Sequence, residues 1–240
     1  MIASQKMRKR KKAMADNPHQ HNREWFLARR GKLTSSRMHT IVHGGPKAWT
    51  TLINKLLEEQ ASDDILEKDL DFVPAIAHGR KYESVARANV EMDRGFDTTL
   101  VGFVTHPVYD FIGCSSDYVL WEPDGPKKRG KKVTGRVVCN GEIKCPYNID
   151  NHRRVYQTGR MPDEHRPQVQ CQMFVHDVDT TLFTSYHPNE PHWKMRTVTV
   201  EVKRDEPYCA YMLERCQQFM RALRGEAPVV TKAISIPSLF

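Results

Sequence analysis

The chain has 240 residues and a formal net charge of +8, from 37 Lys and Arg against 29 Asp and Glu. Hydrophobic residues make up 39% of it, and no apolar run approaches the ~20 residues of a membrane span or the apolar core of a secretory signal. Composition therefore excludes membrane-spanning, collagen-like, coiled-coil and wholly disordered chains. The excess of positive charge suggests a polyanionic partner, with nucleic acid first.

The positive charge is concentrated in two short runs. Residues 6–12 contain six basic residues and residues 127–132 contain five, and the remaining chain has 26 basic against 29 acidic residues. We expect residues 1–20 to form a disordered basic arm, because they contain few apolar residues among many charges. A single domain over residues 21–226 and a short tail over 227–240 complete the predicted organisation.

Helices are predicted in most of the first 95 residues. A short helix beginning near Trp25 is followed by a glycine break, with residues 34–36 as the cap of a second helix. Residues 46–60 begin at a proline and carry apolar residues at helical spacing. An acidic loop is expected over 61–73, and another long helix follows Pro74.

The hydrophobic period then changes from helical to extended. Four short segments rich in β-branched and aromatic residues predict adjacent strands of a mostly antiparallel meander: 98–105, 108–113, 117–121 and 135–144. The later segments predict a helix, two strands and a final helix: 164–177, 180–186, 194–202 and 207–224. Together these elements predict a mixed α/β domain with one central sheet flanked by helices.

The six cysteines are widely spaced and none forms a CxxC pair. Reduced, mostly buried thiols are therefore expected, as in a cytoplasmic protein. Zinc is not expected, since its structural sites need four ligands at short paired spacings. The Gly31-Lys32 pair lacks the surrounding residues of a phosphate-binding Walker loop, so an ATPase is not indicated.

Asp117 and the Gly141-Glu142-Ile143-Lys144 segment form the main candidate for chemistry. In a strand, alternate side chains share a face, so Glu142 and Lys144 point together and Ile143 points into the opposite layer. With Asp117 on a neighbouring strand, two carboxylates and the Ile143 carbonyl would offer hard oxygen ligands suited to Mg²⁺. The alternative is an exposed ion pair that contributes under ~1 kcal/mol.

Five blocks of sequence resemble, in order, those of the phage lambda exonuclease and YqaJ-type viral recombinase family of PD-(D/E)XK nucleases. The blocks contain the candidate residues already described and lie within residues 25–173. They are Trp25 with Arg29-Arg30-Gly31-Lys32-Leu33-Thr34-Ser35-Ser36, His78-Gly79-Arg80-Lys81-Tyr82-Glu83 with Ala86-Arg87, Gly113-Cys114-Ser115-Ser116-Asp117, Gly141-Glu142-Ile143-Lys144-Cys145-Pro146 and Gln168-Val169-Gln170-Cys171-Gln172-Met173. The resemblance implies a restriction-endonuclease-like α/β core.

The resemblance also implies an activity: a Mg²⁺-dependent exonuclease that degrades linear double-stranded DNA from a 5′ end and leaves 3′ single-stranded tails for phage-type recombination. Asp117, Glu142 and Ile143 would hold the metal, with two ions per site and Mn²⁺ able to substitute. Lys144 would orient or deprotonate the attacking water. Glu83 and Gln168 would support the site, although either residue also suits an ordinary helix surface.

Arg29, Ser36 and Ser115 match the family's pocket for a 5′-phosphate. A guanidinium grips phosphate with paired donors, and hydroxyls at a helix start add neutral donors. A helix cap for Ser36 and a turn hydrogen bond for Ser115 are the plainer alternatives.

The chain also departs from the family pattern. Ser116 and Tyr118 stand where the family's turn has proline and glycine. Lambda-type enzymes use a further aspartate for a second metal, and Asp110 is the nearest candidate for it in this chain. The alternative is that Asp110 is an exposed residue at a strand end.

The insert between the last two predicted strands of the meander contains the second basic run. We expect its cations to contact duplex phosphates beside the cleft: Lys127, Lys128, Arg129, Lys131 and Lys132. The resemblance further implies a ring-shaped homotrimer, and the apolar end of the tail suggests a strand-annealing protein as partner, or packing on its own domain. The rival functions are an endonuclease of the same fold and a non-catalytic DNA-binding protein.

Overall fold

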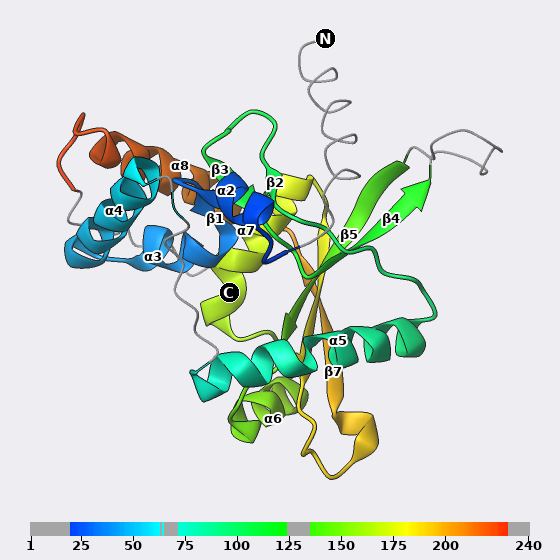
Figure 1. Ribbon diagram of the computed structural model, residues 1–240. Coiled ribbons are helices and arrows are strands. Elements are labelled where there is room, and N and C mark those ends of the chain that lie inside the picture. Colours follow the sequence, from blue (N-terminus) through cyan, green and yellow to red (C-terminus); the bar gives the residue numbers. More distant parts are fainter. Residues whose placement is uncertain (1–19, 63, 65–71, 124–134, 230–240) are drawn as a thin grey trace.

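The computed structural model describes residues 20–62, 64, 72–123 and 135–229 (Figure 1). The predictions for the basic arm, for the basic run at 127–132 and for the apolar tail end lie outside the described residues, as does most of the acidic segment at 61–73. The described elements are α2 (Arg23–Arg29), β1 (Leu33–Thr34), η1 (Ser35–Arg37), α3 (Met38–His43), α4 (Pro46–Ala61), α5 (Pro74–Arg94), β2 (Val104–Thr105), β3 (Ile112–Cys114), β4 (Tyr118–Pro123), β5 (Gly135–Lys144), α6 (Ile149–Thr158), η2 (Asp163–His165), α7 (Arg166–His176), β6 (Thr180–Tyr186), η3 (Trp193–Met195), β7 (Thr197–Lys203) and α8 (Glu206–Leu223).

A mixed sheet of four strands, in the order β4-β5-β6-β7, forms the centre of the domain. The β4–β5 and β6–β7 pairs are antiparallel, whereas β5 and β6 run parallel, with Glu142 opposite Phe183. The parallel pair needs a crossover connection, which α6 and α7 supply. The predicted fold class, a mixed sheet flanked by helices, is confirmed.

The predicted antiparallel meander is wrong in placing all four strands in one sheet. Residues 98–105 and 108–113 contribute only the short strands β2 and β3, which pair antiparallel as predicted but join β1 in a separate three-stranded sheet. The β1–β3 pair is parallel, with Thr34 beside Gly113. The ring of His106 accepts hydrogen bonds from the backbone N–H groups of Val108 and Tyr109, which bends the chain where a strand was expected.

Two further differences concern helices. The sequence pattern predicted no element at 149–158, where α6 lies, because the segment is mostly polar and only His152 and Val155 of that helix are buried. Its caps were nevertheless readable, since Asn148 accepts a hydrogen bond from Asp150 N–H and Gly159 is left-handed. The expected side-chain cap near residue 34 is wrong: Thr34 makes no capping hydrogen bond, and a single 3₁₀ turn precedes α3.

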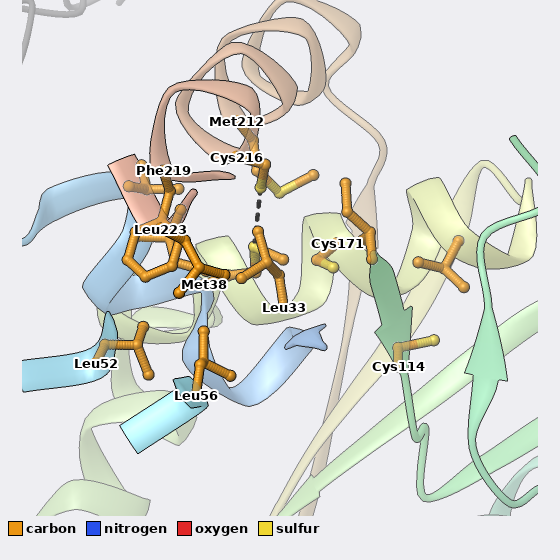
Figure 2. Close-up of a cluster of buried hydrophobic side chains, with 14 of the residues drawn as sticks. Leu33, Met38, Leu52, Leu56, Cys114, Cys171, Met212, Cys216, Phe219 and Leu223 are labelled. Atoms are coloured by element: carbon orange, nitrogen blue, oxygen red, sulfur yellow. Dashed lines mark hydrogen bonds between the residues drawn. The ribbon is translucent and has the colours of Figure 1, made fainter. Parts of the chain in front are cut away.

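The other long helices lie where they were predicted, and the helix α7 lies between the two sheets (Figure 1). One side of α7 belongs to the large core around β1 and β3, with α3, α4 and α8, which Figure 2 shows in part. Cys216 donates there to the sulfur of Met38 at 3.6 Å. The other side of α7 contributes Val169 and Met173 to a second core against β6. A third core lies between α5 and the opposite face of the four-stranded sheet.

All six cysteines are buried free thiols, as expected. Burial raises the pKa of Cys139 and of Cys209 to about 11, so these thiols stay protonated and behave as small apolar groups. Within the described ranges, no helix is long and apolar enough to cross a membrane.

Candidate active site

The two strands that carry the candidate carboxylates are locked together at the site. Asp117 immediately precedes β4, and its backbone N–H donates to the Gly141 carbonyl at 3.1 Å. Its side-chain Oδ2 accepts from the Ile143 N–H at 2.5 Å. These two bonds fix the Asp117 carboxylate beside the end of β5, where Glu142 and Lys144 project from one face as predicted, with Ile143 packed in the opposite core.

The residues by which the chain departs from the family's turn have specific partners. The fully buried Ser116 meets His176 of α7, with 3.2 Å between its Oγ and the ring Nε2. The buried ring of Tyr118 covers Gly141 so closely that a Cβ at this glycine would collide with it. Both departures therefore contribute contacts that hold the turn against the sheet and α7.

Glu142 is a buried carboxylate, only 1% exposed, and both of its oxygens accept hydrogen bonds. Its Oε1 accepts from Lys144 Nζ and from Gln168 Nε2, the latter at 2.6 Å. Its Oε2 accepts from Gln172 Nε2 at 2.5 Å. A buried charge is tolerated when it is paired and hydrogen-bonded in this way, so Glu142 is held in one orientation.

Gln172 extends this network to a second region of the site. Its Nε2 also lies 3.5 Å from the Ser115 carbonyl, and its Oε1 accepts from Asn140 Nδ2 at 3.4 Å. Thr181 Oγ1 donates in turn to Asn140 Oδ1 at 3.1 Å. Sequence reasoning gave no role to Gln172, Asn140 or Thr181, although Gln172 lies in the glutamine block that resembles the family.

Glu83 projects from α5 into a cleft of about 570 Å³ that Ile143 and Lys144 also line. The side chain keeps an exposed surface, yet it is enclosed enough that burial raises the pKa of its carboxyl, and the charge of Glu142 raises this pKa further. The structure thus brings Glu83 together with the carboxylates of the two strands.

Electrostatics at the site are dominated by crowded carboxylates. Burial raises the pKa of Asp117 well above its usual range, and the negative charges of Glu142 and Glu83 add to the rise. Burial lowers the pKa of Lys144, but the attraction of Glu142 and Asp117 outweighs it and the pKa ends above the ordinary value. The site therefore favours an added positive charge among its oxygens.

A second group of predicted residues lies on the side of the small sheet. Trp25 of α2 donates from its indole Nε1 to Ser115 Oγ at 2.8 Å, and the Arg29 guanidinium lies over the Trp25 ring, 3.8 Å from its centre. Ser36 is exposed and lies 3.0 Å from Thr34 Oγ1, where β1 runs beside β3. Arg29 and Ser115 thus come together through Trp25, and Ser115 leads through Gln172 to Glu142.

Asp110 lies apart from the gathered carboxylates. It is exposed in the turn between β2 and β3, where its backbone carbonyl accepts from Lys32 Nζ at 2.6 Å. No described contact joins its side chain to Asp117 or Glu142. Its position matches the alternative expectation of an exposed residue at a strand end.

The donor set of the site suits a hard divalent cation. In the part of the chain that the structure describes, no three His, Cys, Asp or Glu side chains are arranged as a metal site. Mg²⁺, however, commonly binds through one or two carboxylates and completes its shell with waters and substrate phosphate. Asp117, Glu142 and the Ile143 carbonyl offer such a partial set, and the mutual repulsion of the carboxylates is what a cation would relieve.

The fold and the comparisons with known proteins define a nuclease of the PD-(D/E)XK type, a hydrolase acting on DNA. Residues 24–184 match the YqaJ-like viral recombinase domain, and the chain belongs to this family. The resemblance seen in the sequence is thereby confirmed. No curated protein matches the chain in sequence.

Solved structures support the same assignment. The alkaline exonuclease LHK-Exo from Laribacter hongkongensis is 26% identical, with a TM-score of 0.70 over 85% of this chain and 94% of that chain. The same enzyme has been solved in complex with dAMP. A phage-related exonuclease from Haemophilus somnus 129PT shares the fold at 15% identity, with a TM-score of 0.57 over 81% of this chain and 96% of that chain.

Proposed function

We propose that the protein is a Mg²⁺-dependent exonuclease that degrades one strand of linear double-stranded DNA from its 5′ end. The observation that carries the proposal is the link from Arg29 and Ser115, through Gln172, to Glu142 and Lys144. A group able to bind a terminal phosphate is joined to a group able to cleave a phosphodiester. The 26% identity to an alkaline exonuclease supports the reaction class.

In this proposal Asp117, Glu142 and the Ile143 carbonyl hold the metal, with Glu83 at the edge of the site. The bound cation supplies Lewis acidity toward a phosphoryl oxygen and acidifies a water. Gln168 and Gln172 fix the Glu142 carboxylate through its two oxygens. Lys144 places an ammonium at the cleft, where it orients the attacking water and balances the charge that develops on the phosphate.

Arg29, Ser115 and Ser36 would bind the 5′-phosphate of the strand being degraded. A guanidinium is the side chain best suited to phosphate because it donates paired hydrogen bonds. The Trp25 ring orients Arg29 by a cation–π contact and positions Ser115 by its indole hydrogen bond. A ring-shaped trimer and a strand-annealing partner remain part of the proposal by resemblance.

One assay tests the reaction. Purified protein is incubated with linear duplex DNA labelled at either the 5′ or the 3′ end, and with closed circular duplex, in Mg²⁺, in Mn²⁺ and in EDTA. We expect early release of 5′-labelled nucleotide from linear DNA, only with metal, together with accumulation of 3′ single strands. Early loss of the 3′ label would reverse the proposed polarity.

Cutting of circles would identify an endonuclease of the same fold. Binding without cleavage under every metal condition would favour the non-catalytic reading. Size-exclusion chromatography with light scattering measures whether the protein is a trimer in solution.

A further inference from the structure

The cleft that contains Glu83 and Lys144 extends away from the strand carboxylates toward the beginnings of α5 and α6. Arg80 of α5 and Arg154 of α6 line it, together with Asn151. Both arginines are exposed, and neither belongs to the catalytic group described above. The cleft also contains Glu164, whose carboxylate lies 3.8 Å from His165 Nε2, so its wall is not uniformly positive.

An exposed aromatic side chain stands directly beside this cleft. Tyr147 follows the lining residue Pro146 and is 63% exposed. Its ring meets the His78 ring edge-on at 5.7 Å between centres, and its backbone carbonyl lies 3.5 Å from His187 Nε2. An aromatic ring beside arginines is the combination that binds single-stranded nucleic acid.

The two ends of the site differ in what they can bind. Arg29 and Ser115 lie on the side of the small sheet, whereas Arg80 and Arg154 lie beyond Lys144 on the side of α5 and α6. If the 5′-phosphate occupies the first end, as the proposed function requires, the strand that continues past the scissile bond must enter the second end. A cleft of about 570 Å³ has the size of a small-ligand site, which suits the nucleotides of a single strand.

We infer that the cleft between α5 and α6 binds the degraded strand on the 3′ side of the scissile phosphate. Arg80 and Arg154 contact the phosphates there, and Tyr147 stacks on an adjacent base. The inference rests on the proposed function and adds to it a binding site for the uncut part of the strand. The phosphate contacts then fall into two groups. The 5′ group selects the DNA end, and the 3′ group holds the rest of the strand so that the scissile phosphate stays at the active site.

The test measures single-turnover release of the first nucleotide from 5′-phosphorylated duplexes in which one linkage is an uncharged methylphosphonate. Neutralising the second or third linkage from the 5′ end should slow the wild-type enzyme about tenfold, the usual scale of a charged hydrogen bond. Arg154→Ala and Arg80→Ala should release the first nucleotide of unmodified DNA more slowly than the wild type does. The methylphosphonate should slow these variants little further. Both variants should retain the preference for 5′-phosphate over 5′-hydroxyl ends.

Arg160→Ala is the matched control, because Arg160 is an exposed cation just beyond α6 that does not line the cleft. It removes the same charge and should leave the sensitivity to the methylphosphonate intact. Tyr147→Leu should weaken binding of the strand, while Tyr147→Phe keeps the ring and should restore it. Thermal melting confirms that each variant is folded.

The inference is overturned if Arg154→Ala and Arg80→Ala keep the wild-type sensitivity to the neutral linkage, or if Arg160→Ala behaves as they do. Fluorescence anisotropy measures the binding of 5′-phosphorylated duplex ends in EDTA, where no cleavage occurs. This measurement separates failure of the inference from failure of the proposed function. A wild-type protein that never cleaves would end the proposed function. Selective weakening of end binding by Arg154→Ala, without an effect of Arg160→Ala, would still support the cleft as the strand site.

Discussion

The two sheets of the domain contribute to the site in different ways. The four-stranded sheet has the longer strands, and backbone hydrogen bonds at the β4–β5 pair hold Asp117 beside the segment that carries Glu142. The three-stranded sheet has strands of only two or three residues, and it places Ser115 beside the segment that carries Ser36. The groups proposed to act on the phosphodiester thus lie on the sheet with the longer strands, while the groups proposed to bind the end lie on an assembly of short strands and helices.

The helix α7 connects the two regions that the proposed function joins in one site. Eight of its eleven residues are buried, including Gln170 and Gln172. Gln172 contacts both Glu142 and the Ser115 carbonyl, and Gln170 anchors the far end by donating to the Lys203 carbonyl and accepting from Asp205 N–H. Buried amides keep their hydrogen-bond partners because an unsatisfied one costs about 1–3 kcal/mol. The polar face of α7 therefore fixes one sheet relative to the other.

The largest effect is expected from the carboxylates of the large sheet. Asp117→Asn or Lys144→Ala should lower single-turnover cleavage by ~10²–10³-fold or more, because the first removes a charge proposed to hold the metal and the second removes the ammonium proposed to orient the water. Binding of duplex ends, measured by anisotropy, should change little. If these variants also lost the binding of duplex ends, cleavage and end binding would not be assigned to different sheets as proposed.

Gln172→Leu should affect both regions. It leaves a Glu142 oxygen and the Asn140 amide without their partner, so metal affinity should fall ~10-fold or more, and the melting temperature should fall by a few degrees. The preference for 5′-phosphorylated ends should fall as well, since the link to Ser115 is lost. Metal titration by calorimetry and the ratio of rates on phosphorylated and hydroxyl ends measure the two effects.

Gln168→Leu is the comparison for this variant, because Gln168 contacts Glu142 without reaching Ser115. It should weaken metal binding and keep the end preference. An unchanged end preference in Gln172→Leu would show that α7 does not couple the two regions.

Arg29→Ala removes a single charged contact from the end-binding region. The rate on 5′-phosphorylated ends should fall about tenfold, while the rate on 5′-hydroxyl ends stays near that of the wild type. Arg29→Lys retains the charge but not the paired donors, so it should restore only part of the preference. Equal slowing on 5′-phosphorylated and 5′-hydroxyl ends would show that Arg29 acts by packing on Trp25 and not by binding the phosphate.

The smallest effect on catalysis is expected from the basic run at 127–132, which lies outside the described residues. Replacing it with Gly-Ser should weaken duplex binding and reduce the slope of log affinity against log salt by a few units, because fewer counterions are released. Single-turnover cleavage at saturating enzyme should be retained. An unchanged salt slope would show that these five cations do not contact DNA.

Much of the site could be predicted from local pattern, because a strand alternates its side chains. That rule alone placed Glu142 and Lys144 on one face and Ile143 on the other, as the structure confirms. Helices with a strong apolar stripe, such as α4 and α8, were also predicted within one or two residues. The helix α6 was not, because its buried side chains are few and its boundaries depend on caps.

The residues that the sequence could not assign are those defined by distant contacts. Nothing local pairs Trp25 with Ser115, which are 90 positions apart, or Gln172 with Glu142, which are 30 apart. The split of the expected meander into two sheets has the same origin, since β1 reaches β3 from the N-terminal part of the chain. Such pairings depend on how helices pack, and hydrophobic periodicity does not encode them.

The sequence by itself determined which side chains are candidates for the chemistry and where the positive charge of the chain lies. It identified the carboxylates of Asp117 and Glu142, the nearby Lys144 and the distant Arg29 as candidate groups. It also showed that a chain of net charge +8 is a slightly acidic body with two basic runs. Only the tertiary structure decided which of these groups meet. It placed α7 between two sheets and left a cleft lined by Arg80 and Arg154 beside Lys144, because burial of the α7 side chains in two cores fixes the helix where no local pattern could.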